Sequence, residues 1–296
     1  MKNIHSYLII FVVSMFLSSC DVVEGDKREA QIGVVDTGCV FGIDTTPDIR
    51  KVLAEEYTGF LCGNCPEAGI YLADTLQRLF GEQMVAMAVH TGFFSIPCPG
   101  GACTGSQPAG AFQNDYSNAT SNDWGNFFGI ALYPGAMINR FSFPNNFQFP
   151  KASWSTKIAA EIAKPVEAKI RLKKTLDQAN REVSLCIQNR VLVQQPNPLK
   201  LQVVLVEDSV MDWQLWYFHT PEYVPDYFHR HMLRESINGS FGVDAFEANA
   251  AVGSIQTTGY KFTVNSSYDL NQTAAVVFLY DANTYRVLQV EEIKLK

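Results

Sequence analysis

Two closely spaced cysteines offer the clearest chemistry in this sequence. Cys62 and Cys65 are separated by Gly-Asn, and a Cys-x-x-Cys pair of this kind can form a local disulfide or supply a nucleophilic thiolate. Residues 50–57 are rich in Val, Leu and Tyr, as in a strand, and apolar side chains recur at helical spacing from Pro66 until Gly81. The pair therefore falls where a strand ends and a helix begins.

That junction gives the two thiols different predicted roles. Free amide hydrogens and the positive end of the helix dipole stabilise a thiolate, so Cys62 is expected to be the outward-facing, attacking thiol. Cys65, one turn into the helix, would resolve a mixed disulfide. A permanent structural disulfide is one alternative, and half of a zinc site completed by Cys98 and Cys103 is another. Zinc requires four close thiolates that stay reduced, so no metal site is assigned.

The N-terminal residues predict export from the cytosol. Lys2 precedes an apolar stretch over residues 7–17, which is too short to cross a bilayer as a helix, so residues 1–19 are expected to be a signal peptide. Leu-Ser-Ser-Cys at residues 17–20 resembles the bacterial lipobox and predicts a lipid anchor at Cys20. Ordinary secretory cleavage, which leaves Cys20 as a thiol, is the alternative. Residues 20–48 are acidic and aperiodic, as in a tether.

Composition excludes several classes of protein. With 296 residues and 47% hydrophobic residues the chain can bury a large core, and its length suggests about two domains. The formal charge of −7 and 18% charged residues provide no basic stripe for a phosphate backbone, so nucleic acid is not an expected partner. No motif requires a cofactor. In an exported protein the cysteines are free to form disulfides.

The cysteine motif resembles the thioredoxin active site, in which a buried carboxylate lies shortly before the first cysteine. Glu56 stands six positions before Cys62, and the resemblance implies that it exchanges a proton with the resolving thiol. The resemblance also implies a cis peptide bond at Pro134, with the backbone of Tyr133 pairing with a bound peptide. A trans proline opening an edge strand is the alternative. Leu61 and the Gly-Asn pair depart from the usual thioredoxin residues, which leaves the direction of electron flow open.

The elements after the motif fit a thioredoxin-like domain over residues 49–164. Residues 84–90 predict a buried strand, and a long insertion at about 93–122 contains Cys98 and Cys103, for which a local disulfide is favoured. The remaining predicted elements are a helix at 124–132, a strand at 135–141, a hairpin at 141–149 and a helix at 153–164 that Ser153 could cap. His90 ends a strand at the sheet edge where ligands bind; tuning of the Cys62 thiolate and simple satisfaction by loop backbone are both open.

The second half of the chain, residues 165–296, predicts an all-β domain. Alternating apolar residues indicate half-buried strands near 166–173, 183–187 and 260–264, and apolar runs indicate buried strands at 199–206 and 274–280. The pattern changes register within 285–295, as at a β-bulge. An immunoglobulin-like antiparallel β-sandwich is the economical interpretation, so the predicted fold class is α/β plus all-β. Cys186 either pairs with Cys39 or stays free.

An aromatic segment interrupts these strands. Seven of the 16 residues from Trp213 to Phe228 are aromatic, so this predicted loop should bury itself against the cysteine-bearing domain or against a partner. His219, His229 and His231 lie close by in sequence. They lack a carboxylate at a recognisable spacing, so they are not assigned to a metal.

Several short motifs together resemble the Omp-twenty-eight related outer membrane lipoproteins of Bacteroidetes. These motifs are Glu55-Glu56-Tyr57-Thr58-Gly59, Val89-His90-Thr91-Gly92, Tyr133-Pro134-Gly135, Ile138-Asn139-Arg140 and His231-Met232-Leu233-Arg234. The resemblance implies a lipoprotein of the outer membrane. The predicted function is thiol:disulfide exchange with exported proteins, peptides or a redox partner. The alternative is a non-catalytic surface protein that binds or adheres through its sandwich domain and aromatic segment.

Overall fold

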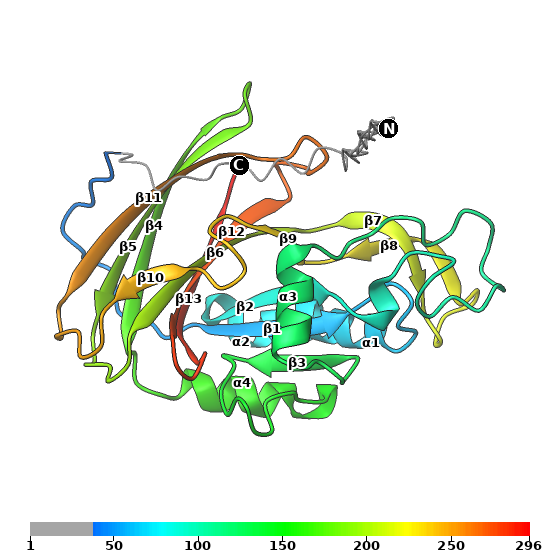
Figure 1. Ribbon diagram of the computed structural model, residues 1–296, viewed down its shortest axis with the longest axis horizontal. Helices are drawn as coiled ribbons and strands as arrows, with labels where there is room; N and C mark the ends of the chain where they lie inside the picture. The colour runs from blue at the N-terminus through cyan, green and yellow to red at the C-terminus, as the bar shows by residue number, and fades with distance from the viewer. Residues whose placement is uncertain (1–37) are drawn as a thin grey trace, which may run out of the picture. The chain divides into compact units, whose positions relative to one another are not determined.

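The computed structural model describes residues 38–296. The predicted signal peptide, the lipidation site Cys20 and the first part of the predicted tether lie outside these residues. The described chain is a mixed α/β structure, mostly strands in several sheets with a few helices (Figure 1). No helix among residues 38–296 is both long and apolar enough to span a membrane.

One eight-stranded sheet contains strands from both halves of the chain. Its order is β13–β12–β6–β9–β2–β1–β3, and β10 pairs with β6. The sheet runs across the predicted domain boundary at residue 165, because β2 meets β9 in parallel where Ala88 pairs with Met232. The strands are β1 (Val52–Thr58), β2 (Met84–His90), β3 (Gly135–Ile138), β6 (Leu199–Glu207), β9 (Met232–Ser236), β10 (Val243–Phe246), β12 (Thr273–Asp281) and β13 (Val287–Lys294).

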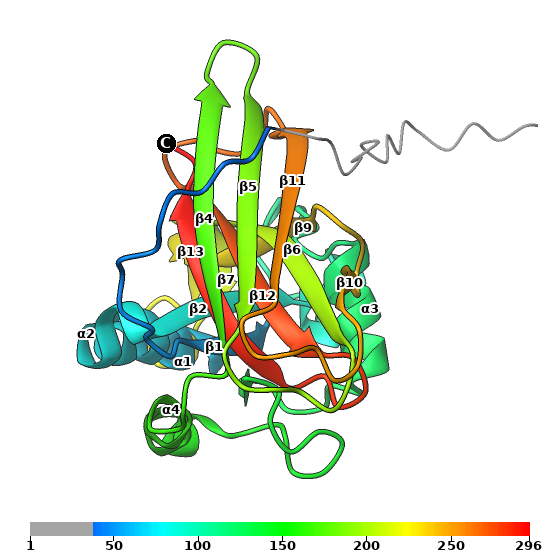
Figure 2. The ribbon, with the colours of Figure 1, turned by 90° about the vertical axis from the view of Figure 1, so that its left-hand side faces the viewer.

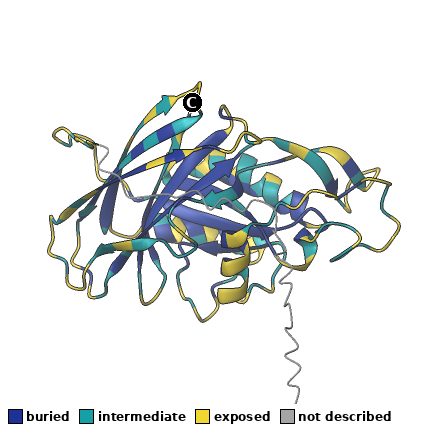
Figure 3. Cartoon of the chain, turned by 45° about the horizontal axis from the view of Figure 1, so that its top comes forward, coloured by how far each residue is buried: buried dark blue, intermediate teal, exposed yellow. Residues whose placement is uncertain are grey.

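A three-stranded sheet packs against one part of this large sheet. It has the order β11–β5–β4 and consists of β4 (Ala168–Asp177), β5 (Glu182–Val191) and β11 (Ile255–Thr263). Buried and half-buried residues alternate strictly along β5, as its sequence predicts. Its buried side chains meet those of β6 and β12 in one apolar core, and Figure 2 shows the two layers of strands. In Figure 3 the central strands are mostly buried, and exposed residues gather in the loops.

The helix after the cysteine motif is confirmed, with one difference. It runs without a break through α1 (Cys65–Ile70), a π-helical turn (Tyr71–Leu76) and α2 (Gln77–Phe80), and it ends at Gly81 with φ of 57°. Leu72 and Leu76 are buried, but Leu79, the next leucine at helical spacing, is 63% exposed. The π-helical turn inserts an extra residue into the helical repeat, so it rotates the following side chains away from the core.

Three local predictions between residues 117 and 164 are wrong in detail. Helix α3 (Ala119–Phe127) begins before Trp124, because the Asn118 side chain accepts a hydrogen bond from the Ser121 amide and forms a capping box. Residues 141–149 form turns rather than a hairpin, and only Phe149 forms a bridge, to Ala136. Helix α4 (Trp154–Ile162) receives no side-chain cap from Ser153, whose hydroxyl donates to the Pro150 carbonyl instead. A β-bulge does occur between β12 and β13, but not where the sequence pattern placed it: the register shifts between the pairs Leu279–Gln289 and Tyr280–Val287, and pairing is regular from Gln289 to Lys294.

The end of the predicted tether is fixed to the three-stranded sheet. A disulfide joins Cys39 to Cys186 of β5, with a Cα–Cα distance of 5.6 Å. Side chains of β4 then hold the following backbone: Lys169 donates to the Thr46 carbonyl at 2.6 Å, and Lys173 donates to the Val40 carbonyl at 2.8 Å. Residues 38–48 therefore lie along the outer face of this sheet (Figure 2).

Removal of this disulfide should loosen the N-terminal segment. In a Cys39→Ser/Cys186→Ser double variant we expect the free energy of unfolding to fall by about 2 kcal/mol, because the cross-link closes a long loop in the unfolded chain. The segment 38–48 should also become a protease site. Urea denaturation and limited proteolysis measure both effects. An unchanged urea midpoint together with an unchanged digestion pattern would contradict the prediction.

Candidate functional site

Cys62 and Cys65 lie at the predicted junction. β1 ends at Thr58, and the chain turns through residues 59–64 into α1, with the Cys62 amide donating to the Gly59 carbonyl and the Cys65 amide to the Cys62 carbonyl, both at 3.0 Å. A disulfide joins the two cysteines, with a Cα–Cα distance of 5.3 Å. The local sequence therefore builds a compact strand–turn–helix site around one S–S bond.

The prediction that the Cys62 sulfur faces outward is wrong. Cys62 and Cys65 are each only 3% exposed. The aromatic segment folds back over them as a two-stranded sheet, β7 (Val210–Leu215) and β8 (Tyr223–His229), rather than as a loop. The spacing of the cysteines specifies the turn that they form, but it contains no information about a hairpin some 150 residues later that covers it.

The hairpin β7–β8 contacts the cysteine loop through its backbone and its rings. The Leu215 amide donates to the Phe60 carbonyl at 2.8 Å, and the Tyr217 amide donates to the Gly63 carbonyl at 2.9 Å. A Cβ atom on Gly63 would lie 2.6 Å from the Tyr217 ring, so the ring rests directly on this glycine. Part of the aromatic segment is therefore an intramolecular cover.

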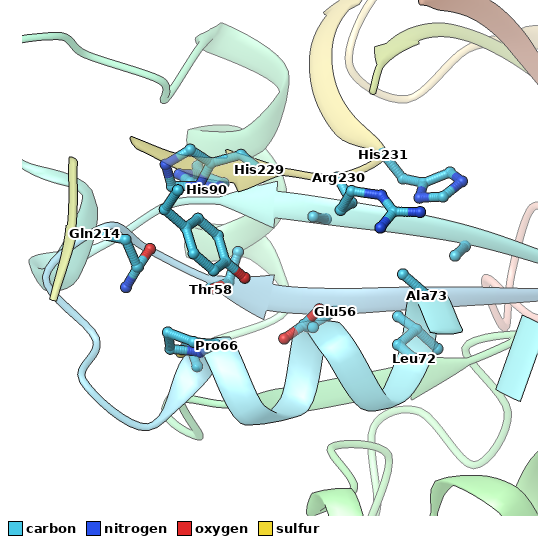
Figure 4. A pocket seen from close by; sticks show the side chains of 15 residues that line it. Glu56, Thr58, Pro66, Leu72, Ala73, His90, Gln214, His229, Arg230 and His231 are labelled. Carbon is cyan, nitrogen blue, oxygen red and sulfur yellow. The ribbon is translucent and has the colours of Figure 1, made fainter. Parts of the chain in front are cut away.

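Glu56 lies on β1 beneath the helix that carries Cys65. The residue is 3% exposed, and its Oε1 atom has no hydrogen-bond partner in the structure. Burial raises the pKa of Glu56 to about 8, because the charged carboxylate loses its hydration there. At neutral pH the side chain is therefore mainly a protonated acid. Figure 4 shows it pointing from β1 toward the helix.

Glu56 and Cys65 line the same small cavity, together with His90 and His229. Figure 4 shows the side chains of Glu56, His90 and His229 around it. The cavity has a volume of about 30 Å³. The two imidazole rings lie 5.3 Å apart, and His90 Nδ1 and His229 Nε2 are buried atoms without hydrogen-bond partners. Burial lowers the pKa of His90 well below its usual value and lowers the pKa of His229 to about 4. Both rings are therefore neutral at pH 7, and His90 has no positive charge with which to stabilise a thiolate.

Tyr133 and Pro134 lie at the start of β3, beside β1. The peptide bond between them is cis, as expected, and the next residue, Gly135, pairs with Tyr57 of β1. The Tyr133 hydroxyl packs toward Gly92, where an added Cβ atom would lie 2.5 Å from it. Burial raises the pKa of Tyr133. A role in peptide docking stays a prediction for these two residues.

The predicted insertion at about residues 93–122 also packs against the cysteine loop. A disulfide joins Cys98 to Cys103, with a Cα–Cα distance of 5.7 Å. Both residues pack near Phe60 and Leu61, in a cluster that also includes residues of the hairpin β7–β8. The site is therefore built from three regions that are far apart in sequence.

Sequence reasoning missed the contributions of the hairpin to the site. Gln214 and Tyr227 line the cavity beside Glu56, and His229 places its ring against His90. The only available signal was the density of aromatic residues, which indicated an interface without naming its other side. Among residues 38–296 no three His, Cys, Asp or Glu side chains are arranged to hold a metal ion.

Comparisons with known proteins address the second half of the chain more than the cysteine motif. A family model of the outer membrane protein Omp28 matches residues 121–296, more than half of the chain. This match begins within α3, after Cys62 and Cys65. The search of curated proteins gives no match.

Two solved structures show weak similarity. A domain of the outer membrane lipoprotein Omp28 from Porphyromonas gingivalis is 16% identical with a TM-score of 0.29, and the alignment covers 45% of this chain and 91% of that one. The alkylpurine DNA glycosylase AlkC of Pseudomonas fluorescens, bound to DNA containing an abasic site analogue, is 12% identical with a TM-score of 0.21. That alignment covers 48% of this chain and 34% of that one.

At these scores neither structure supports an argument about fold or activity, so the assignment depends on the family model. The family model describes an outer membrane protein, which places this protein in the cell envelope. The chain belongs to the Omp28 outer membrane protein family.

Proposed function

We propose that this envelope protein exchanges disulfides with exported proteins through Cys62 and Cys65. One observation carries the proposal: the Cys62–Cys65 disulfide lies at a helix start and shares a cavity with a buried, protonated carboxyl group, Glu56. A disulfide that serves only as a staple has no use for a buried acid beside it. Titratable groups whose pKa is shifted by burial cluster at functional sites, because the chemistry there needs the shifted pKa although the burial costs stability.

The oxidised pair can accept electrons from a substrate dithiol. After the substrate thiols lose their protons to solvent, one substrate thiolate attacks Cys62 Sγ. The Cys62–Cys65 bond breaks, and its electron pair stays on Cys65, which takes the proton of Glu56. The second substrate thiolate then attacks the substrate sulfur that is bound to Cys62, and Cys62 leaves as a thiolate. The substrate becomes a disulfide, and the protein gains the two electrons as a dithiol. The reverse sequence reduces a substrate disulfide.

A thioredoxin-like arrangement around the site is part of the proposal. Parallel strands β1 and β2 are joined by the helix that starts at Cys65, and β3 runs antiparallel to β1 directly after cis-Pro134. The packing of the three-stranded sheet against β6 and β12 of the large sheet supports an immunoglobulin-like sandwich. A lipid at Cys20 would anchor both parts to the outer membrane.

Exchange requires movement of the hairpin β7–β8, because a 3% exposed Cys62 cannot meet another protein's sulfur. That same burial favours the second candidate function, a binding protein in which the disulfide is structural. Tyr217, Phe218 and Phe228 are 53%, 71% and 54% exposed on the hairpin, and they would be the contact residues of such a protein.

The reduction potential of the Cys62–Cys65 pair distinguishes these functions. Equilibration in defined thiol buffers, followed by alkylation and mass spectrometry, should give a value between about −270 and −120 mV, the range of exchange proteins. The Cys39–Cys186 disulfide, measured in the same samples, is the internal structural control. A potential for Cys62–Cys65 below about −300 mV, which is typical of structural disulfides, would overturn the proposal. A Cys62→Ser variant should also lose all exchange with a reduced exported protein.

A further inference from the structure

The hairpin β7–β8 covers the cysteine loop largely with main-chain contacts. The amides of Leu215 and Tyr217 donate to the carbonyls of Phe60 and Gly63. The Gln214 side chain adds two long bonds from its Nε2 atom, at 3.3 Å to the Cys62 carbonyl and at 3.5 Å to the Gly59 carbonyl. Main-chain carbonyls accept bonds from any extended peptide, so the partner that they bind need not be this hairpin.

One ring completes the contact. The Tyr217 ring occupies the space directly above Gly63, where any side chain would collide with it. Beside it, the Trp216 indole donates to Glu67 Oε1 at 3.1 Å. The surface around the disulfide therefore fits an extended segment that carries aromatic side chains next to its backbone donors.

The hairpin also belongs to neither of the two larger sheets. β7 and β8 pair only with each other among the described strands, whereas the other strands belong to the two larger sheets. A two-stranded hairpin alone is marginally stable, so its position depends on the contacts that it makes. Its base is held elsewhere, where Asn114 donates to Asp212 at 2.7 Å. The tip over Gly63 can therefore lift without disrupting either larger sheet.

We propose that the loop Gly59–Gly63 is a docking site for an extended, aromatic-containing segment of an exported polypeptide. The tip of the hairpin, residues 214–217, occupies this site as a built-in competitor and controls access to Cys62. An incoming segment replaces the amide donors of Leu215 and Tyr217 and the ring over Gly63. That the incoming segment is a redox substrate rests on the proposed function. That the hairpin tip covers the loop Gly59–Gly63 does not depend on it.

The rate at which dithiothreitol reduces the Cys62–Cys65 disulfide tests the cover. We expect Tyr217→Ala to raise this rate at least about tenfold, because its ring no longer holds the hairpin tip on Gly63. Phe218→Ala is the matched control, since its neighbouring ring is 71% exposed, and its rate should stay within about twofold of the original. Equal rates in Tyr217→Ala and Phe218→Ala would overturn the proposal.

A second variant keeps the test valid if Tyr217→Ala fails to fold. Gly63→Ala keeps Tyr217 but puts a methyl group where the ring lies, so it should lift the tip and accelerate reduction as well. No acceleration in a folded Gly63→Ala variant would contradict the cover. Circular dichroism verifies the fold of each variant.

Peptide binding tests the docking site directly. The probe is a synthetic peptide with the sequence of residues 212–219. Fluorescence anisotropy should show that it binds Tyr217→Ala more tightly than the unaltered protein, and Gly63→Ala should not bind it tightly, because the added methyl group takes the place of the peptide's Tyr ring. A peptide with its Trp and Tyr residues replaced by Ala should bind at least about tenfold more weakly. Equal binding of both peptides would contradict an aromatic-specific site. Faster reduction combined with the potential of a structural disulfide would remove the proposed exchange function and leave the cover intact.

Discussion

Replacing Arg140 with methionine should lower the free energy of unfolding by about 3–5 kcal/mol, because it leaves an unpaired carboxylate in the core. Arg140 Nε and Nη2 donate to Glu55 Oε2 and Oε1 at 2.8 and 2.6 Å, and both side chains are at most 1% exposed. The guanidinium carbon lies 4.6 Å from the Trp124 ring centre and 5.0 Å from that of Phe278. The pair therefore connects β1 to an aromatic cluster.

Urea denaturation followed by circular dichroism measures this loss. Lys157→Met is the matched control, because Lys157 also lies 5.0 Å from an aromatic ring, that of Phe149, but is only half-buried, so its loss should stay below about 1 kcal/mol. A Glu55→Leu/Arg140→Met double variant should recover most of the stability, since neither charge remains buried. A loss below about 1 kcal/mol in Arg140→Met would show that the buried pair is not important for stability.

Replacing Glu56 with glutamine should stabilise the protein by about 3 kcal/mol at pH 7. The pKa of Glu56 is about 8 in the folded protein against an ordinary value of 4.5, so the folded state holds this proton more tightly than the unfolded state. The stabilising effect of that proton is complete below about pH 4.5 and is lost as the pH rises through about 8. Glutamine has no proton that the unfolded state could release at pH 7, so the variant does not lose this stability as the pH rises.

The difference in the free energy of unfolding between the unaltered protein and Glu56→Gln, measured against pH, reports the titration of the Glu56 carboxyl group. Between about pH 6.5 and pH 8 the unaltered protein should lose about 2 kcal/mol relative to Glu56→Gln, as measured by urea denaturation at each pH. Glu82→Gln, at an exposed position, is the control and should differ from the unaltered protein by less than about 0.5 kcal/mol throughout. Parallel pH profiles for the unaltered protein and Glu56→Gln would contradict a buried, protonated acid. Under the proposed function Glu56→Gln also slows exchange, because Cys65 loses its proton donor.

Local patterns in the sequence predicted the elements that carry the site. The strand at residues 84–90, the helix that stops at Gly81, the alternation along β5 and the cis bond before Pro134 all agree with the structure. Each depends on residues close together in the chain, or on a motif whose local geometry is well known. Glu56 came instead from the resemblance to the thioredoxin active site, in which a buried carboxylate lies shortly before the first cysteine, and the structure does bury it.

Contacts between distant segments could not be predicted in this way. Glu55 and Arg140 are separated by 85 positions, and Cys39 and Cys186 by 147. Neither separation leaves a periodic signal. The aromatic density of the hairpin β7–β8 indicated burial but did not identify what it covers, so the enclosed state of the disulfide was missed.

The sequence by itself therefore determined the local arrangement: a cysteine pair at a strand–helix junction, with a carboxyl group on the strand that precedes it. Only the tertiary structure decided whether that cysteine pair is accessible, because exposure of Cys62 depends on where a segment some 150 residues away folds. Side-chain periodicity specifies which face of an element is buried, whereas the identity of the covering element follows from the packing of the whole chain.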